Sequence, residues 1–321
     1  MSDQKQIKLK LFCDESASEG WLYFGILFVQ ELGESSFLHD LLNNRCSNSS
    51  RTKNWGECAP ICSHHSKNNT EVHFKEILEN SHSHKYDVAS RWVDYFLQDV
   101  DNVYFYMLGI DLNNLDKTYF GDSRVEDNIY NRFFRTAILK AGKSFFNKYD
   151  NIVITDVIHD ISDSKEKHKY FNWHPIFFIN QNDSKVSVAS PKITYVDSDH
   201  RKEKSHPMYS HFIQFVDLIL GCARLCLDNT SDDKLKRKLA FQSWTLIDRL
   251  LNKPGNINSE YKYVNRLKIE FFPKHNLRNY PNEELRKIKS WDSFYTKREA
   301  MIGQKGQKLL PLIYDETQTN K

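Results

Sequence analysis

Two apolar runs near the amino terminus constrain the fold of this chain most strongly. Residues 7–13 alternate polar and apolar side chains and end in the polar cluster Asp14-Glu15-Ser16, and residues 21–29 are almost continuously apolar. Two such runs separated by a short polar segment are typical of a β-hairpin. We therefore expect a sheet whose first strand runs into a pair of carboxylates.

The remaining apolar patterns predict helices and further strands. The spacings indicate a short third strand over residues 71–77, a helix over 86–100, a buried strand over 103–110, a long helix over 126–146, strands over 151–158 and 193–196, and a helix over 208–227 that Pro207 opens. Strands and helices that alternate in this order predict an α/β fold with helices packed on a central sheet.

Composition changes divide the chain into three parts. Residues 34–70 are polar, with a short helix followed by a loop of low periodicity, and we interpret this part as an insertion. Residues 1–230 otherwise form the main domain. Residues 231–321 carry a basic helix over 234–251, a strand over 267–272 and a Lys-rich tail, and we expect this extension to pack on the same domain.

Composition and charge exclude several classes of protein. The chain has 321 residues, of which 40% are hydrophobic and 27% charged, so we expect neither a disordered chain nor a membrane protein. A net charge of +3 excludes a strongly basic domain that coats nucleic acid unaided. No signal peptide opens the sequence and the six cysteines are scattered as buried thiols are, which predicts a cytoplasmic protein.

Several carboxylates stand among apolar residues. Asp14 closes the first strand, Asp156 follows Ile152 and Ile154 at a spacing of two, Asp197 ends the strand over 193–196, and Asp217 lies inside the apolar helix. A buried carboxylate is costly unless it is paired, hydrogen-bonded or bound to a metal. We therefore expect several of them to share a cation.

The helix over 208–227 carries one polar stripe, formed by Ser210, Gln214, Asp217, Gly221 and Arg224 at spacings of four, three, four and three. Two interpretations are open. The stripe faces water on a partly exposed amphipathic helix, or it faces a functional site, for which the bare Gly221 leaves room.

The motifs together resemble a known family. Asp14-Glu15-Ser16, the segment with Glu71, His73 and Glu76, the pair Asp197-Ser198, and the series Gln214, Asp217 and Gly221 match, in order, the motifs of a bacterial domain family of unknown function that is grouped with ribonuclease H-like folds. The resemblance spans residues 7–227. One departure is Ala17, which stands where the family has a glycine.

The resemblance implies a central mixed sheet with helices on both sides and carboxylates that converge at one end to hold two Mg²⁺ or Mn²⁺ ions. The implied catalytic metal ligands are Asp14, Asp217, Asp156 and Glu76, with Glu71 and Asp197 as further ligands. Glu15 is expected to point away from Asp14, and Glu15, Ser16 and Gln214 to support the ligands. Asp111 is an alternative to Asp156, because these sheets place a carboxylate at the end of their fourth strand.

The implied function is a metal-dependent nuclease or a related phosphodiester hydrolase. Lys202, Lys204 and Arg224 are the residues we expect to contact a phosphate backbone. The alternative is a non-catalytic module that binds nucleic acid or a protein partner in a phage-defence or mobile-element system.

Zinc is a weaker expectation. Cys46, Cys58, Cys62, His64 and His65 gather in the insertion, but the spacing lacks the paired Cys-x-x-Cys motifs of zinc knuckles. From the sequence we expect a loop with free thiols rather than a zinc site.

Overall fold

The structure is a computed structural model of the chain. It describes residues 5–18, 20–49, 54–58, 62–79, 84–98, 100, 102–161, 179–180, 183–190, 192–228, 231–251 and 266–273, with the side chains of 228 and 244–251 left aside. The Lys-rich tail beyond residue 273 lies outside the described residues.

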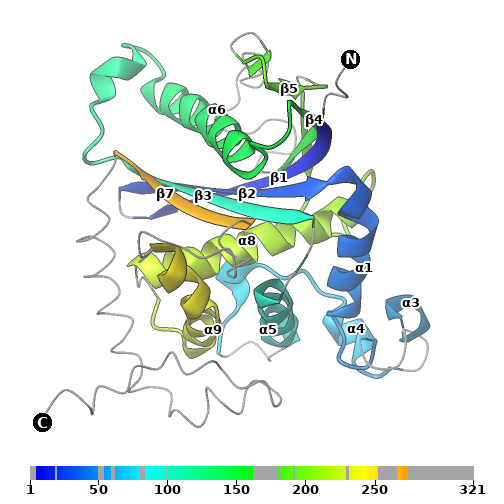
Figure 1. Cartoon of the computed structure of the whole chain (residues 1–321). Helices are drawn as coiled ribbons and strands as arrows, with labels where there is room; N and C mark the ends of the chain where they lie inside the picture. Colours follow the sequence, from blue (N-terminus) through cyan, green and yellow to red (C-terminus); the bar gives the residue numbers. More distant parts are fainter. Residues whose placement is uncertain are drawn as a thin grey trace, which may run out of the picture.

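A seven-stranded mixed sheet forms the centre of the fold (Figure 1). The strands are β1 (Gln6–Ser18), β2 (Trp21–Gln30), β3 (Val103–Asp111), β4 (Asn151–Asp160), β5 (Val186–Val188), β6 (Ile193–Val196) and β7 (Leu267–Phe272). The first three pair antiparallel in chain order, which confirms the predicted hairpin. β4 lies parallel to β1 on its other side, and β5 and β6 both lie parallel to β4. β7 closes the opposite edge, parallel to β3.

Helices cover both faces of the sheet (Figure 1), as the predicted α/β class requires. Helix α6 (Val125–Phe145) packs on one face, and α1 (Glu34–Asn43), α5 (His84–Leu97), α8 (Pro207–Asp228) and α9 (Lys234–Leu251) lie on the other. The short elements are α3 (Trp55–Cys58), α4 (His65–Asn68) and the 3₁₀ turns η1 (Glu31–Gly33), η2 (Phe74–Glu76) and η3 (Lys117–Phe120).

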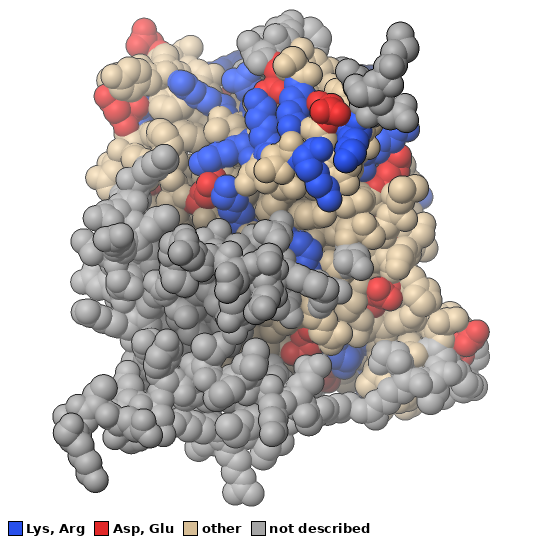
Figure 2. Space-filling view, in the orientation of Figure 1, with Lys and Arg blue, Asp and Glu red and all other residues tan. Residues whose placement is uncertain are grey.

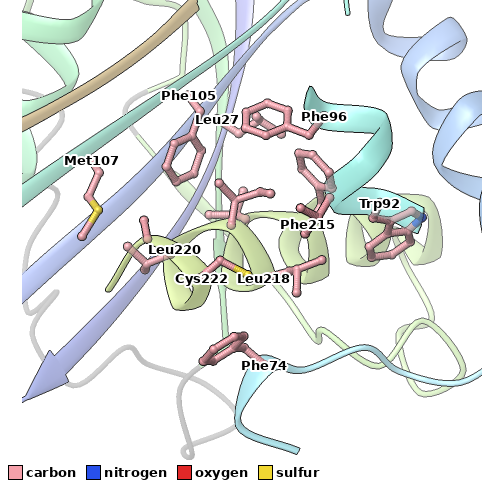
Figure 3. Packing of buried hydrophobic residues seen from close by; sticks show 14 of the residues in the cluster. Leu27, Phe74, Trp92, Phe96, Phe105, Met107, Phe215, Leu218, Leu220 and Cys222 are labelled. Carbon is pink, nitrogen blue, oxygen red and sulfur yellow. The ribbon is translucent and has the colours of Figure 1, made fainter. Parts of the chain in front are cut away.

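Two buried clusters hold these layers together. Leu9, Leu11 and Cys13 of β1 point into the α6 cluster, whereas Phe12 points into the α8 cluster, because successive residues of a strand face opposite sides. Figure 3 shows the α8 cluster, in which Phe105 and Met107 of the sheet lie on one side of α8 and Phe74 lies on the other. Helix α8 is therefore a central element with protein on both sides.

Helix α8 approaches the sheet closely at Gly25 of β2. A Cβ atom at Gly25 would lie 3.2 Å from the side chain of Leu220, so the glycine lets the helix backbone come near the strand. By length and composition α8 would suffice to span a membrane, but 89% of its apolar window is buried inside the protein. A core helix of a soluble protein has this property.

The predicted third strand over residues 71–77 is wrong. No residue of this segment belongs to a strand: His73 and Ile77 have extended backbone, and the turn η2 lies between them. Its backbone donors are satisfied by side chains of α8 instead of a neighbouring strand: Val72 N–H donates to Gln214 Oε1 at 3.0 Å, and Phe74 N–H donates to Asp217 Oδ2 at 2.6 Å. The sequence of residues 71–77 does not reveal that Gln214 and Asp217, far along the chain, accept its hydrogen bonds.

Candidate functional site

A pocket of about 560 Å³ opens beside the carboxyl-terminal parts of β1 and β4, where α8 crosses the sheet. Asp14 of β1, Asp160 of β4 and Asp217 of α8 line it, together with His73 from the segment before η2. Three carboxylates from elements far apart in the sequence are thus gathered around one cavity.

The register of two parallel strands places Asp14 beside Asp160. Phe12 pairs with Ile158 and Cys13 pairs with His159, so the next position brings Asp14 level with Asp160. Phe12 and Ile158 both belong to the cluster on the α8 side. Side chains alternate along a strand, so Asp14 and Asp160, which follow Phe12 and Ile158 by two residues, face the same side. Asp217 of α8 lies on that side.

Asp156 lies elsewhere than expected. The register between β1 and β4 shifts after Leu9, which pairs with Ile154, so that Lys10 pairs with Asp156 and Thr155 is an extra residue. Ile152, Ile154 and Val157 face the α6 side, so the bulge places Asp156 on the opposite side, which is that of Ile158. Distance along the strand, and not the side of the sheet, separates Asp156 from the pocket. Asp156 precedes Asp160 by four residues, about 13 Å along a strand, and it is absent from the lining of this pocket.

Asp160 is the carboxylate that the sequence analysis missed, because the strand predicted over 151–158 extends to Asp160 itself. With residues 71–77 outside the sheet, β4 is the fourth strand in the chain, and its terminal carboxylate is Asp160 rather than Asp111. Asp111 instead accepts hydrogen bonds from the backbone N–H groups of Asn113 and Asn114 in the following loop, at 3.0 and 3.1 Å. The sequence did contain a signal for Asp160, because the apolar run of β4 ends close to this carboxylate.

Burial and neighbouring carboxylates raise the pKa of Asp14 and of Asp160. Burial, followed by the charges of Asp217 and Asp160, raises the pKa of Asp14 well above its usual range. Burial, followed by the charge of Asp217, raises the pKa of Asp160 to about 8. The pocket therefore concentrates negative charge and favours either protons or a cation.

His73 balances part of this charge. Its Nδ1 donates to Asp217 Oδ2 at 2.8 Å, and the Phe74 N–H donates to the same oxygen. The hydrogen bond to Asp217 raises the pKa of His73 to about 9, so the ring is an imidazolium at neutral pH. Its side chain is 38% exposed and lines the pocket.

The polar stripe of α8 binds two loops instead of facing water. Ser210 Oγ donates to the carbonyl of Asp197 at 2.6 Å, and Gln214 is buried, accepting hydrogen bonds from Arg45 and the Val72 N–H. The space beside Gly221 is filled: a Cβ there would lie 2.3 Å from Cγ of Phe74. Gly221 therefore leaves room for Phe74, not for a ligand.

The other expected ligands have partners outside the pocket. Glu76 is exposed and forms an ion pair with Lys85, because η2 turns its side chain toward solvent. Glu71 Oε1 accepts a hydrogen bond from Ser198 Oγ at 2.7 Å, and Asp197 Oδ1 accepts one from the Asp199 N–H at 2.8 Å. None of these three described residues lines the pocket.

Glu15 faces the α6 side of the sheet, opposite the side chain of Asp14. Tyr130 of α6 donates its hydroxyl to Glu15 Oε2 at 3.0 Å, and His159 Nε2 lies 3.2 Å from the same oxygen. Alternation along β1 therefore separates the two neighbouring carboxylates. Ser16, two residues after Asp14, accepts a hydrogen bond from Arg224 at the pocket.

Basic side chains are distributed unevenly. Arg224, Lys75 and Lys236 line the pocket. Lys202 forms an ion pair with Asp199, and Lys204 is exposed; both are described, and neither lines the pocket. In the view of Figure 2, Lys and Arg gather over the part of the molecule that α6 occupies in Figure 1.

Comparisons of the chain with protein-family models, with curated proteins and with solved structures give no match. The class that the structure itself defines is a mixed α/β protein with a seven-stranded sheet flanked by helices and a carboxylate-lined pocket at one end.

Proposed function

We propose that this protein is a divalent-metal-dependent nuclease, or a related phosphodiester hydrolase, that holds Mg²⁺ or Mn²⁺ on Asp14, Asp160 and Asp217. Asp160 takes the place that the sequence had offered to Asp156 or Asp111. Glu76, Glu71 and Asp197 are left out of this proposed ligand set, because their described contacts lie outside the pocket.

The observation that carries the proposal is a buried carboxylate oxygen. Oδ1 of Asp160 is inaccessible to solvent and has no hydrogen-bond partner among the described residues. An unpartnered buried carboxylate beside two others is unfavourable in the metal-free protein. Carboxylate oxygens are the ligands that Mg²⁺ and Mn²⁺ prefer, so a divalent cation would remove this penalty.

The spacing of the carboxylates bears on the number of ions. Among the described residues, the cysteines form the group of ligand atoms that all lie within 4.8 Å of one another, and the three aspartates do not. One ion would therefore need the aspartate side chains to move closer together, whereas two ions about 4 Å apart distribute their ligands over a larger volume.

The other residues of the pocket suit a phosphodiester substrate. The bound ions would activate a water molecule and stabilise the leaving oxygen. His73 is protonated at neutral pH, and because its Nδ1–H is bound to Asp217, its Nε2–H is the proton that it can donate to a departing oxygen. Arg224 and Lys236 supply positive charge on the pocket wall, where a phosphate group would lie.

The finer classification also belongs to the proposal. A mixed sheet with helices on both faces and carboxylates from the first strand, the fourth strand and the last helix of the main domain supports the ribonuclease H-like relationship that the motifs implied. The mostly buried α8 supports a soluble protein, and we place it in the cytoplasm with nucleic acid as its partner.

One observation favours the alternative, a non-catalytic binding module. Asp217 Oδ2 accepts two hydrogen bonds, from His73 and from the Phe74 backbone, which is what a purely structural aspartate would do. The nuclease requires that the carboxylates bind a metal ion and that Asp217 stays ionised. The binding module requires neither.

The test combines a metal titration with a cleavage assay. We expect Mg²⁺ or Mn²⁺ to raise the melting temperature of the wild-type protein and to support cleavage of single- or double-stranded DNA or RNA oligonucleotides. Asp160→Asn should abolish both effects while the protein stays folded, because the amide cannot supply the charge that holds the ion.

Asp156→Asn is the matched control, since Asp156 lies on the same strand but does not line the pocket. It should keep the metal-induced shift and the cleavage. A wild-type protein that shows no metal-induced shift and no cleavage, yet binds an oligonucleotide, would reject the nuclease and support the binding module.

A further inference from the structure

Three cysteine thiols of the insertion meet at one point. Cys46 follows α1, Cys58 ends α3 and Cys62 precedes α4. Cys46 Sγ lies 3.8 Å from Cys58 Sγ and 3.5 Å from Cys62 Sγ, and all three sulfur atoms lie within 4.8 Å of one another. Thiols twelve and sixteen residues apart in the chain are thus brought together by the fold.

We propose that Cys46, Cys58 and Cys62 bind a structural zinc ion. Zinc holds thiolates at about 2.3 Å in tetrahedral geometry, which places any two of its sulfur ligands about 3.8 Å apart. The distances from Cys46 Sγ to Cys58 Sγ and to Cys62 Sγ are close to this value. Three residues separate Cys58 and Cys62, one more than in a Cys-x-x-Cys motif, so the pair does not show the spacing of a zinc knuckle.

The described part of the insertion after α1 buries few apolar side chains. Among its described residues from 44 onward (44–49, 54–58 and 62–70), the buried hydrophobic side chains are those of Cys46 and Cys58. Its helices α3 and α4 have four residues each, far fewer than a helix needs to be stable alone. Small units of this kind are commonly held together by a metal ion or a disulfide.

His65 is the residue that we propose for the fourth coordination position, although it is not part of the group of ligand atoms that lie within 4.8 Å of one another, so its ring would have to move toward the sulfur atoms. It follows Cys62 by three residues, and its ring stacks on Trp55, the first residue of the helix that ends in Cys58. Its Nδ1 is buried and has no hydrogen-bond partner among the described residues. Neutral imidazole nitrogen is a common zinc ligand beside three thiolates.

The zinc site would order the segment that supplies His73. Arg45, next to Cys46, is buried and donates to the carbonyls of Asn68 and Thr70 at 3.1 and 2.7 Å. These carbonyls immediately precede the segment with His73 and Phe74. The inference does not depend on the proposed nuclease function, because the site would stabilise the fold whatever the pocket does.

The experiment measures zinc in the full-length protein purified without chelator. We expect about one zinc ion per chain in the wild type. Cys62→Ser should lose it; Cys62 is the least buried of the three thiols and so the one whose change disturbs packing least. Cys222→Ala, which changes a buried cysteine of α8 outside the cluster, should keep the zinc, as should Asp160→Asn, which tests whether the ion lies in the carboxylate pocket instead.

Two further measurements guard against a folding artefact. Cobalt added to the metal-free wild type should give thiolate charge-transfer absorption in the near ultraviolet, and Cys62→Ser should weaken it. His65→Ala should lower zinc affinity at least about tenfold; an unchanged affinity would reject His65 as the fourth ligand. Equal zinc contents in wild type and Cys62→Ser, or a mass and thiol count that show a disulfide between two of the three cysteines, would overturn the zinc site.

Discussion

The ring of Phe74 occupies the place that a side chain on Gly221 would fill, with its Cγ 2.3 Å from the position of a Cβ there. The N–H of the same residue donates to Asp217, one turn earlier on α8. His73 precedes Phe74 and pairs with Asp217 through its ring. The absence of a side chain at Gly221 therefore lets Phe74 pack against α8 and places His73 beside Asp217.

Gly221→Ala should displace Phe74 and loosen the contact between His73 and Asp217. Overpacking a buried position costs roughly 1 to 3 kcal/mol, from which the better helix propensity of alanine recovers up to about 1 kcal/mol. We expect a net loss in the free energy of unfolding, measured by urea denaturation, and a weaker metal-induced shift in melting temperature. Gly142→Ala in α6 is the control, because its Cβ would meet only Val186 at 3.9 Å, and it should be neutral or stabilising. Equal stability of the two variants would contradict the role given to Gly221.

Asp160→Asn should change how the stability of the metal-free protein depends on pH. The folded-state pKa of Asp160 is raised to about 8 from 3.8, so folding favours its protonated form. The wild type therefore loses stability as the pH rises from about 4 to 8, as Asp160 ionises more readily in the unfolded chain than in the folded one. We expect the variant and the wild type to melt together near pH 4, and the variant to melt higher toward pH 8. A gap that does not grow with pH, or an equal gap in Asp156→Asn, would contradict the mutual repulsion of the carboxylates.

His73 should titrate far above an ordinary histidine. Its pKa is raised to about 9 by the hydrogen bond with Asp217, so the stabilisation from this pair is fully present below pH 6.5 and fades as the pH rises through 9. An NMR titration of the imidazole ring measures this pKa directly. Asp217→Asn should bring it back toward 6.5, whereas Glu76→Gln, which removes an exposed carboxylate three residues away, should leave it high. A wild-type value near 6.5 would show that the ion pair does not form in solution.

Arg224→Gln should weaken binding to nucleic acid more than Lys202→Gln does. Arg224 lines the pocket, whereas Lys202 is 68% exposed and paired with Asp199. If Arg224 contacts one phosphate, its loss should lower the affinity and reduce the slope of log affinity against log salt by about one. Fluorescence anisotropy of a labelled oligonucleotide over a range of salt concentrations measures both quantities. Equal effects of the two substitutions would remove Arg224 from the proposed binding surface.

The elements of the fold were largely predictable, because most of their residues follow one periodicity. The hairpin of β1 and β2, the buried strand β3, the long α6 and the apolar α8 all appear near the predicted bounds. Each of these segments buries an apolar face or both faces, and such burial requires side chains at fixed spacings that the sequence displays. β5, with three residues, was too short to show a pattern.

The errors share one physical cause, which is that a contact between distant segments replaced a local rule. Residues 71–77 read as a strand, but Gln214 and Asp217 of α8 accept the hydrogen bonds that a neighbouring strand would have accepted. Asp156 pairs with Lys10, four residues before Asp14, so the register between β4 and β1 leaves it outside the pocket. Neither the distant acceptors nor the register leaves a signature in the local periodicity.

The sequence by itself determined that carboxylates would be buried, since Asp14 and Asp217 stand in segments that are otherwise apolar and must pack in a core. Only the tertiary structure decided which third carboxylate joins them, because that choice depends on the pairing register of β4 with β1. The same holds for the cysteines: their residue types are visible in the sequence, but the distances between their sulfur atoms are set by how the chain packs between α1 and α4. Residue chemistry is a local property, whereas the convergence of ligands is a property of contacts between segments far apart in the chain.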